Sequence, residues 1–392
     1  MEQAIEKKRL KIGYKLSICG AQIIGDRVAQ SPLSIKDNST MLSITTNGCL
    51  PARWDTKLGY QKKKLIIRTL PTIFDDGGLV PALDIVVCRK MPILYSESLP
   101  NGTIVTRTAK EEEEVRRMAH GYGHYGGLHR QSSCISIPNF RTDQRTSNTP
   151  HLDRTLSEPR SFEDRRVSGY FKIRICDSNS LSNRHWATLL LSNANELNHL
   201  DIVEGNRYKI FFVMPYQPKN KKYLGLDLKT TRMTRWEPVP NINITNTYIP
   251  RFLTECKDIR HQDTISDFDL VILILQIGTA TLEHLNGRKL WHQTLLVTDE
   301  SEGICQIDLK LPFNPIPDIK GQVIGLVNVR YETYDSKFDI TCLKATDETE
   351  VLSKASSAAE YMQKGLSKLR NWVQSNPDRI HTITERIQNL IQ

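Results

Sequence analysis

The sequence predicts a mainly β protein made of small barrels in tandem, the first of them incomplete, with helices at the C-terminal end. Three observations lead to this prediction. Short apolar segments separated by turn residues run along most of the chain. A glycine followed by a strand-like segment recurs three times, and residues 348–392 change to the spacing of an amphipathic helix.

The recurring element is a glycine that opens a strand of seven or eight residues. Gly13, Gly205 and Gly321 occupy this position, where glycine tolerates a positive φ before the strand. The last two copies follow further apolar strands, which are Phe171–Cys176 with Trp186–Leu191 and Phe268–Leu275 with Trp291–Val297. Five short strands per unit predict small barrels, for which the OB-fold is the first candidate. SH3-like barrels and sandwiches have a similar pattern.

The first copy of this element has no strands before it that could complete a barrel. We therefore expect four parts, which are a partial first OB-fold over residues 1–79, a second OB-fold over 80–258, a third over 259–347 and C-terminal helices over 348–392. The second part contains a glycine-, serine- and arginine-rich segment at about residues 120–168, which we expect to be a disordered insertion. A helix is expected just before it, over Arg107–Ala119.

The C-terminal part has apolar residues at spacings of three and four. Pro377 divides this pattern into two helices, the second of which carries Ile380, Ile383 and Ile387. We expect the first helix to pack on the last barrel, and the alternative is a helix that binds a partner.

Composition excludes several classes of protein. The chain has 392 residues, of which 39% are hydrophobic and 25% charged, and no apolar run approaches the roughly 18–20 residues that span a bilayer. We therefore expect no membrane contact. The eight cysteines stand singly, so neither a zinc site nor a disulfide framework is indicated, and a reducing compartment is expected. No nucleotide-binding loop or nucleophile motif is present, so we expect no cofactor and no enzymatic activity.

The positive charge is concentrated in one segment. The formal net charge is +9, and between Arg207 and Arg235 there are eight basic residues and one acid, Asp227. Such a surface attracts nucleic acid, anionic membrane or an acidic protein. The alternative is a solvated hairpin with no partner.

Other polar clusters do not fit a metal site. His120, His124 and His129 lie in the glycine-rich segment without cysteines or carboxylates at fixed spacing. Asp75 and Asp76 precede two glycines and are typical of a turn. A nuclease is therefore not expected, because its metal ions would need further acids.

Three segments resemble one known family. Residues 51–60 (PARWDTKLGY), 74–78 (FDDGG) and 83–92 (LDIVVCRKMP) strongly resemble the junction between the first and second OB-folds of the breast cancer type 2 susceptibility protein family. Weaker similarities to the same family lie in residues 13–25, 204–210, 269–272 and 296–300. The resemblance covers nearly the whole chain except the insertion.

The resemblance implies a non-catalytic protein of the nucleus. The family's OB-folds bind single-stranded DNA, mainly through the second and third folds. They act in homologous-recombination repair of double-strand breaks, as mediators that help a RecA-like recombinase displace the single-strand-binding protein. A small acidic protein, deleted in split hand/split foot, clasps the family's helical domain and first two folds.

Two departures from the family limit what the resemblance implies. The helix that begins the family's tower matches at Glu111–Met118, but the glycine-rich insertion replaces the rest, so a duplex contact at a tower tip is not expected. The family's helical domain and recombinase-binding repeats have no counterpart here. We therefore expect the recombinase to bind through regions that this chain lacks.

The expected mechanism combines contacts to phosphates with stacking of bases on aromatic rings. The residues expected to contact phosphates are Arg207, Lys209, Lys229, Arg232, Arg235 and, in the third unit, Arg330. Trp236, Phe313 and Tyr331 are the expected stacking residues, whereas Trp186 and Trp291 are expected in the barrel cores. The alternative function is a scaffold whose basic surface binds only the acidic protein partner.

Overall fold

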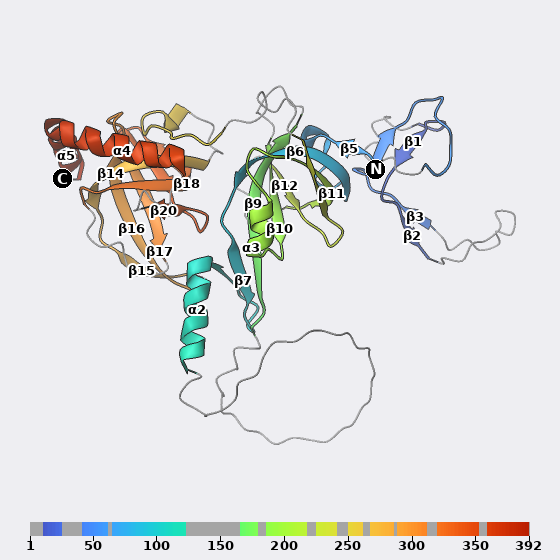
Figure 1. Cartoon of the computed structure of the whole chain (residues 1–392), viewed down its shortest axis with the longest axis horizontal. Coiled ribbons are helices and arrows are strands. Elements are labelled where there is room, and N and C mark those ends of the chain that lie inside the picture. Colours follow the sequence, from blue (N-terminus) through green and yellow to red (C-terminus); the bar gives the residue numbers. More distant parts are fainter. Residues whose placement is uncertain are drawn as a thin grey trace, which may run out of the picture.

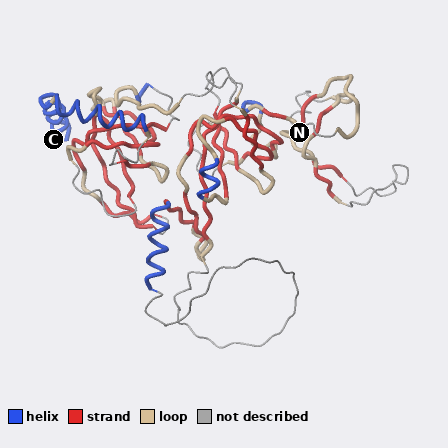
Figure 2. The backbone as a smooth tube through the Cα atoms, viewed as in Figure 1, coloured by secondary structure: helices blue, strands red, loops and turns tan. Residues whose placement is uncertain are grey.

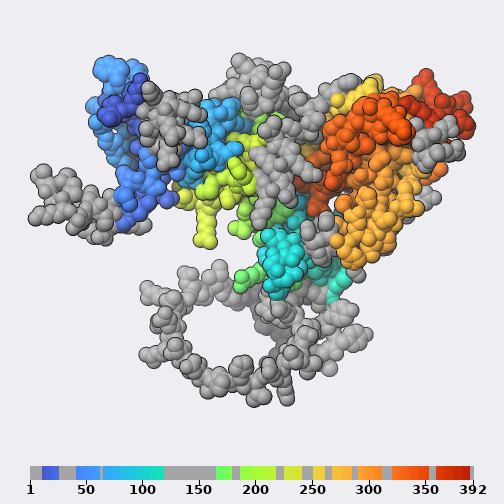
Figure 3. Space-filling model, turned by 180° about the vertical axis from the view of Figure 1, so that it is seen from behind, coloured from blue at the N-terminus to red at the C-terminus, as the bar shows by residue number. Residues whose placement is uncertain are grey.

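The structure is a computed structural model. It describes residues 11–25, 41–61, 65–122, 165–178, 186–217, 225–240, 250–261, 267–285, 288–311, 320–352 and 359–391. Three parts follow one another in chain order along the long axis, with an open N-terminal part at one end and the C-terminal helices at the other (Figures 1 and 3). Strands are the commonest regular structure in the described part of the chain (Figure 2).

The second part is a closed barrel, here called the second barrel. Its five strands are β6 (Val80–Lys90), β9 (Val167–Asp177), β10 (Trp186–Ser192), β11 (Arg207–Pro215) and β12 (Leu226–Lys229). The ring of pairings runs β6–β9–β10–β12–β11 and closes on β6. Only β10 and β12 pair in parallel. In chain order this ring is 1-2-3-5-4, the order of an OB-fold, so the predicted fold is confirmed for this part.

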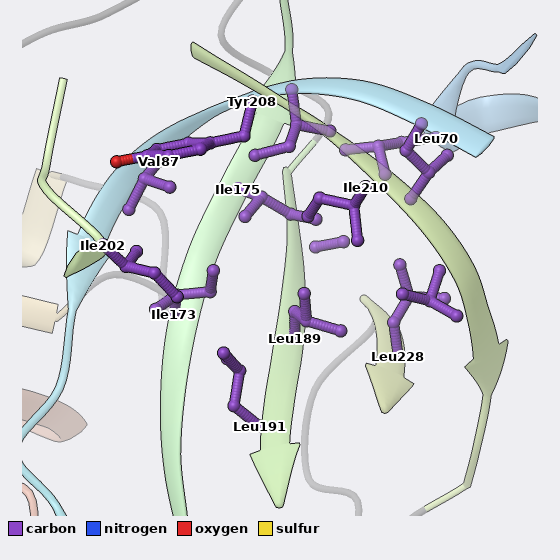
Figure 4. Close-up of a cluster of buried hydrophobic side chains, with 14 of the residues drawn as sticks. Leu70, Val87, Ile173, Ile175, Leu189, Leu191, Ile202, Tyr208, Ile210 and Leu228 are labelled. Atoms are coloured by element: carbon purple, nitrogen blue, oxygen red, sulfur yellow. The ribbon is translucent and has the colours of Figure 1, made fainter. Parts of the chain in front are cut away.

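The core of the second barrel follows from the alternation of its strands. Ile173 and Ile175 on β9 point inward and are fully buried, whereas Lys172 and Arg174, which alternate with them, lie on the outer face. The inward side chains of all five strands meet in one cluster (Figure 4). Its labelled members are Leu70, Val87, Ile173, Ile175, Leu189, Leu191, Ile202, Tyr208, Ile210 and Leu228. The helix α3 (Glu196–Asp201) and Ile202 after it close one end.

The third part repeats the same topology and is here called the third barrel. Its strands are β14 (Asp267–Ile277), β16 (Arg288–Thr298), β17 (Ile304–Leu311), β18 (Val323–Asp335) and β19 (Ile340–Lys344). They form the ring β14–β16–β17–β19–β18, again with one parallel pairing, between β17 and β19. Three shorter elements are added to it, which are β15 (Thr281–Leu285), β20 (Glu350–Leu352) and the 3-10 helix η5 (Ile259–His261).

The glycines that open the recurring strands have the conformation expected from the sequence. Gly13, Gly205 and Gly321 have φ values of 93°, 80° and 79°. A side chain at these positions would be strained, since this region favours glycine. In the second and third barrels the strand after the glycine is the fourth barrel strand in chain order, which is β11 or β18.

A set of elements is inserted between the first two strands of the second barrel. It contains β7 (Leu94–Ser98), β8 (Ile104–Thr108) and α2 (Ala109–Tyr122). The helix starts later than predicted because Arg107 and Thr108 belong to β8. Thr108 and Glu111 then form a reciprocal cap, in which the Glu111 carboxylate accepts from the Thr108 amide at 2.6 Å. The expected disordered segment falls mostly on residues 123–164, which lie outside the described residues.

The two ends of this insertion meet at one carboxylate. Glu97 on β7 accepts hydrogen bonds from Arg165, just before β9, at 2.7 and 2.8 Å, and from Arg107 at 2.5 Å. Arg107 and Arg165 also pair with Glu112 on α2. This cluster fixes the base of the insertion to the second barrel.

The N-terminal part forms no closed barrel among the residues described, as expected for an incomplete first OB-fold. Its strands are β1 (Leu16–Ile18), β2 (Gln22–Ile24), β3 (Met41–Ser43) and β4 (Cys49–Pro51), paired as β1–β4 and β2–β3. The strand β5 (Ile67–Arg68) and the 3-10 helix η1 (Leu70–Thr72) connect this part to the second barrel. Trp54 and Tyr60 remain 86% and 93% exposed.

The C-terminal helices α4 (Glu360–Ser375) and α5 (Pro377–Ile391) pack on the third barrel. Met362, Leu366 and Leu369 of α4 are buried in a cluster that includes barrel residues of β14 and β18. The predicted packing on the last barrel is confirmed, and so is the division at Pro377. Within the described ranges, no helix is long and apolar enough to cross a membrane.

Candidate nucleic-acid interface

OB-folds bind oligonucleotides on the face of strands two and three and on the loops that join strands one to two and four to five. In the second barrel these strands are β9 and β10, and the loop between strands four and five connects β11 to β12. Residues 218–224 of that loop, with Lys219, Lys221, Lys222 and Tyr223, lie outside the described residues.

Three of the predicted phosphate-binding residues lie in one segment beside this face, here called the β12–β13 segment, whose two strands, β12 and β13 (Arg235–Val239), pair with successive parts of β11. Lys229 lies at the end of β12, Arg232 in the turn and Arg235 at the start of β13. Arg232 and Arg235 are exposed and Lys229 is half-buried. None of the three forms an ion pair with another described residue, so the β12–β13 segment presents bases that no described acid pairs with.

Hydrogen bonds fix the turn of the β12–β13 segment. The hydroxyls of Thr231 and Thr234 both donate to the carbonyl oxygen of Phe212, at 2.8 and 2.9 Å. The amide of Thr231 donates to the Thr234 hydroxyl at 2.7 Å. Phe212 itself has a φ of 60° on β11. The turn therefore holds Arg232 in a defined place on the barrel.

Two other predicted residues lie on β11, the fourth strand, among acids. The Arg207 guanidinium donates from Nε and Nη2 to the Asp84 carboxylate at 2.7 and 2.6 Å. Burial raises the pKa of Asp84, but hydrogen bonds from Arg207 and Ser178 and the charges of Arg207 and Lys209 together bring it below its ordinary value. Lys209 stands in register between Asp84 on β6 and Glu237 on β13. Neither base belongs to the face of strands two and three.

The predicted stacking residues are partly packed in the barrels. Trp236 on β13 points inward, where its ring meets that of Tyr208 edge-on at 5.7 Å. It lines a pocket of about 610 Å³ at the end of the second barrel, together with Phe171 and residues of α3. Tyr331 packs against the third-barrel core, and Phe313 lies outside the described residues.

The prediction that Trp186 and Trp291 are core residues is wrong. Both are half-buried and belong to neither barrel core. Trp186 lies on the outer face of β10, because Ala187, Leu189 and Leu191 take the inward positions of that strand. The alternation along β10, counted from Leu189, contains this information, and our assignment by position in the repeat missed it.

Trp186 is accompanied by a base on the same face. The Arg174 guanidinium lies 4.6 Å from the centre of the Trp186 ring, a cation–π contact. Arg174 also donates to the Thr188 hydroxyl and to Asp267 of the third barrel, the latter at 3.0 and 3.1 Å. The face of strands two and three thus carries an aromatic ring and a base that is held in place.

Arg330, the predicted phosphate contact of the third barrel, lies at the junction of the two barrels. It donates to Asp267 at 2.9 Å and to Glu348 at 2.5 Å. Burial raises the pKa of Asp267, but the charges of Arg174 and Arg330 lower it further, to below its ordinary value. Arg330 therefore lies within an ion cluster on the third barrel, whereas Arg232 and Arg235 lie in the β12–β13 segment of the second barrel.

The described residues offer no metal centre. Among them, no three histidine, cysteine, aspartate or glutamate side chains are grouped so as to hold an ion. His124 and His129 lie outside the described residues, and Asp75 and Asp76 form an exposed turn. The described surface therefore offers charged and aromatic side chains for binding.

Comparison with known proteins gives a consistent picture along the chain. Residues 1–62 match the family model described as BRCA2, oligonucleotide/oligosaccharide-binding, domain 1. The chain is similar to two curated Arabidopsis thaliana proteins, BREAST CANCER SUSCEPTIBILITY 2 homologs B and A. It is 22% identical to each, over 457 and 454 aligned residues that cover 98% of this chain. It spans 39% of the length of each.

Among solved structures, the chain is similar to one titled as a Replication Protein A heterotrimer bound to ssDNA. The TM-score is 0.33 and the identity 12%, with 54% of this chain and 48% of that chain covered. The assignment of the two barrels as OB-folds rests instead on their strand order.

Proposed function

We propose that this chain, which belongs to the BRCA2 family, binds single-stranded DNA and catalyses no reaction. It would act in the nucleus as a mediator in homologous-recombination repair of double-strand breaks, together with a RecA-like recombinase. The observation that carries the proposal is the β12–β13 segment, which presents Lys229, Arg232 and Arg235 beside an OB-fold face.

In the proposed mechanism the affinity for DNA depends little on the base sequence of the DNA. Lysine and arginine in the β12–β13 segment neutralise phosphates and release counterions, so the affinity for DNA falls steeply as the salt concentration rises. Exposed rings add stacking energy that is similar for every base, about 1–3 kcal/mol each. Trp186 is half-buried on the outer face of β10, and Trp236 lines the pocket at the end of the second barrel, so these are the rings proposed for stacking there.

A second function is favoured by a different observation. The N-terminal part exposes Trp54, Leu58 and Tyr60 by 82–93%. Arg53 and Lys57 alternate with these side chains. Exposed apolar residues of this size mark interaction surfaces, and the bases suit a partner of acidic composition. A scaffold that binds a small acidic protein, with no DNA role of its own, is therefore the alternative.

One experiment separates the two functions. Fluorescence anisotropy would be measured for a labelled oligo-dT and for a duplex of equal length, across a salt series, with and without the acidic protein. The DNA-binding proposal predicts preference for the oligo-dT and a steep salt dependence in the absence of the partner. Equal binding to both DNAs, or affinity that does not change with salt, would reject it in favour of the scaffold.

A further inference from the structure

Two thiols meet on the outer side of the second barrel, where the proposed function gives them no role. Cys88 lies on β6 and Cys176 on the adjacent strand β9, and the two side chains form a hydrogen bond with each other. With Val86 they make a small buried cluster that is separate from the barrel core. Both cysteines are free, so both sulfurs are available as thiols.

The pairing of β6 with β9 brings these two side chains together. Cys176 is the direct cross-strand partner of Val86, and a bulge between Val87 and Arg89 leaves Cys88 unpaired in the β6–β9 ladder. The Cys88 sulfur also lies 3.8 Å from the Val86 carbonyl oxygen. A disulfide requires the two sulfurs to approach to about 2.0 Å. Because the ladder does not fix a bulged residue, Cys88 can shift toward Cys176 while the strands stay paired.

The two thiols differ in exposure and in acidity. Cys88 is half-buried, whereas Cys176 is only 3% exposed. The hydrogen bond from the Cys88 thiol, together with bonds from the backbone, brings the pKa of the Cys176 thiol below its ordinary value although burial raises it. The same bond to Cys176, together with burial, raises the pKa of Cys88. Cys176 is therefore the readier thiolate, and the thiolate is the form of cysteine that reacts as a nucleophile.

The third barrel contains a second thiol pair that differs in one respect. Cys256 and Cys305 also form a hydrogen bond with each other, but both belong to the barrel core, where their exposed fractions are 1% and 0%. The bond to Cys305 and burial raise the pKa of Cys256 well above its ordinary value. Cysteines buried in this way are inert toward dissolved oxidants, so this pair is an internal comparison.

We propose that Cys88 and Cys176 form a redox-modification site, at which a hydroperoxide converts the two thiols into a disulfide. The Cys176 thiolate attacks one peroxide oxygen, so that an S–O bond forms, the O–O bond breaks and hydroxide leaves. The Cys88 sulfur then attacks the Cys176 sulfur, so that the S–S bond forms and the S–O bond breaks. The two thiol protons go to the two leaving oxygens. With hydrogen peroxide, two thiols are thus oxidised by two electrons and one peroxide is reduced to two molecules of water.

A low-molecular-weight thiol would reverse the modification by exchange with the disulfide. Disulfides of this transient kind are compatible with a reducing compartment, where they serve as redox sensors. The site lies on the face of strands two and three, because Cys176 is the cross-strand partner of Trp186 on β10. The disulfide would therefore tie β6 to β9 beside the ring proposed for stacking. The inference concerns the chemistry of the thiols and does not depend on the binding of DNA.

The test exposes the full chain, first reduced with dithiothreitol and then freed of it, to hydrogen peroxide. Free thiols are blocked, and the protein is digested with trypsin without reduction and analysed by mass spectrometry. Cleavage after lysine and arginine places Cys88 in peptide 69–89 and Cys176 in peptide 175–184. It places the comparison pair in peptides 252–257 and 290–310. The variants are Cys88→Ser and Cys176→Ser, with Cys342→Ser, at another half-buried cysteine, as the matched control.

The proposal predicts a species that joins peptides 69–89 and 175–184, is two hydrogen atoms lighter than their sum and disappears on treatment with dithiothreitol. It should form in the wild type and in Cys342→Ser and be lost in the other two variants. Peptides 252–257 and 290–310 should stay unlinked unless the protein is unfolded in urea. The absence of the joined species from folded wild type would overturn the proposal. So would its formation only in urea, or the linkage of Cys88 or Cys176 to other cysteines instead.

Dimedone, which labels sulfenic acids, tests the order of the two steps. In Cys88→Ser the reaction should stop at the sulfenic acid of Cys176, so peptide 175–184 should carry the label after peroxide treatment. In Cys176→Ser, peptide 69–89 should remain unlabelled, because Cys88 is the less acidic thiol. Labelling of Cys88 but not of Cys176 would overturn the assignment of Cys176 as the nucleophile.

Discussion

Arg207 on β11 donates two hydrogen bonds to the carboxylate of Asp84 on β6, at 2.7 and 2.6 Å. The pair is bidentate, and both side chains are less than a fifth exposed. A base in this arrangement has its charge compensated and its donors directed at an acid. The eight bases between Arg207 and Arg235 are therefore not equivalent, and predictions for them differ.

Replacement of Arg207 by glutamine should affect folding rather than DNA affinity. It leaves Asp84 partly buried without its charged partner, so the free energy of unfolding should fall by about 1–3 kcal/mol. The salt dependence of oligo-dT binding should remain that of the wild type. Urea denaturation and an anisotropy salt series measure the two effects. A lower salt slope together with unchanged stability would show that Arg207 contacts phosphates instead.

Replacement of Arg232 and Arg235 by glutamine should have the opposite effect. Both side chains are exposed, and neither pairs with an acid in the described part of the chain, so stability should change by less than about 0.5 kcal/mol. The slope of log affinity against log salt should decrease by about 0.7 for each arginine that contacts a phosphate. Affinity for oligo-dT, oligo-dA and mixed sequences should fall alike. A loss confined to one sequence would contradict backbone contacts.

Acid should release the base of the insertion. Hydrogen bonds from Arg165 outweigh the effect of burial, and with those from Arg107 they lower the pKa of Glu97 from 4.5 to about 2. A carboxylate whose pKa is lowered on folding stabilises the protein above its unfolded pKa, and this contribution is lost as the pH falls from about 4.5 to 2. Glu97→Gln should therefore be less stable by about 2–3 kcal/mol at pH 7 and have a flatter acid dependence. Parallel pH profiles of the two proteins would contradict this assignment.

The C-terminal helix α4 should behave as part of the third barrel. Leu366 is fully buried between the helix and the barrel, so Leu366→Ala should lower the free energy of unfolding by about 2–5 kcal/mol. Arg370→Ala, at an exposed position of the same helix, is the control and should have little effect. Thermal unfolding followed by circular dichroism measures both. Equal stability of the two variants would indicate a helix that does not depend on the barrel.

Local patterns in the sequence were sufficient for the fold. The strands of both barrels follow from apolar alternation, and Gly205 and Gly321 have the positive φ that their position predicts. The cap of α2 was also present as Thr108 and Glu111, three residues apart. These features depend on residues that are close together in the chain, so they can be predicted from the sequence alone.

The state of each base could not be predicted in the same way. Arg207 and Asp84 are 123 residues apart, and Arg174 and Asp267 are 93 apart, so their pairing depends on the closure and docking of the barrels. The charge count between Arg207 and Arg235 could not show that Arg207 pairs with Asp84, and the choice of Arg330 among the bases and aromatic residues of the third unit could not show that it pairs with Asp267. The wrong prediction for Trp186 has a different cause, because the alternation of side chains along β10 already placed this residue on the outer face of the barrel.

The proposed DNA contact of the second barrel is its β12–β13 segment. Photo-crosslinking of an oligonucleotide that carries 5-iodouracil, followed by mass spectrometry of the crosslinked peptides, tests it most directly. Crosslinks are expected to peptides of residues 225–240 and to Trp186, and they should disappear when unlabelled oligo-dT competes. Crosslinks confined to the third barrel or the N-terminal part, or none that oligo-dT can displace, would contradict it.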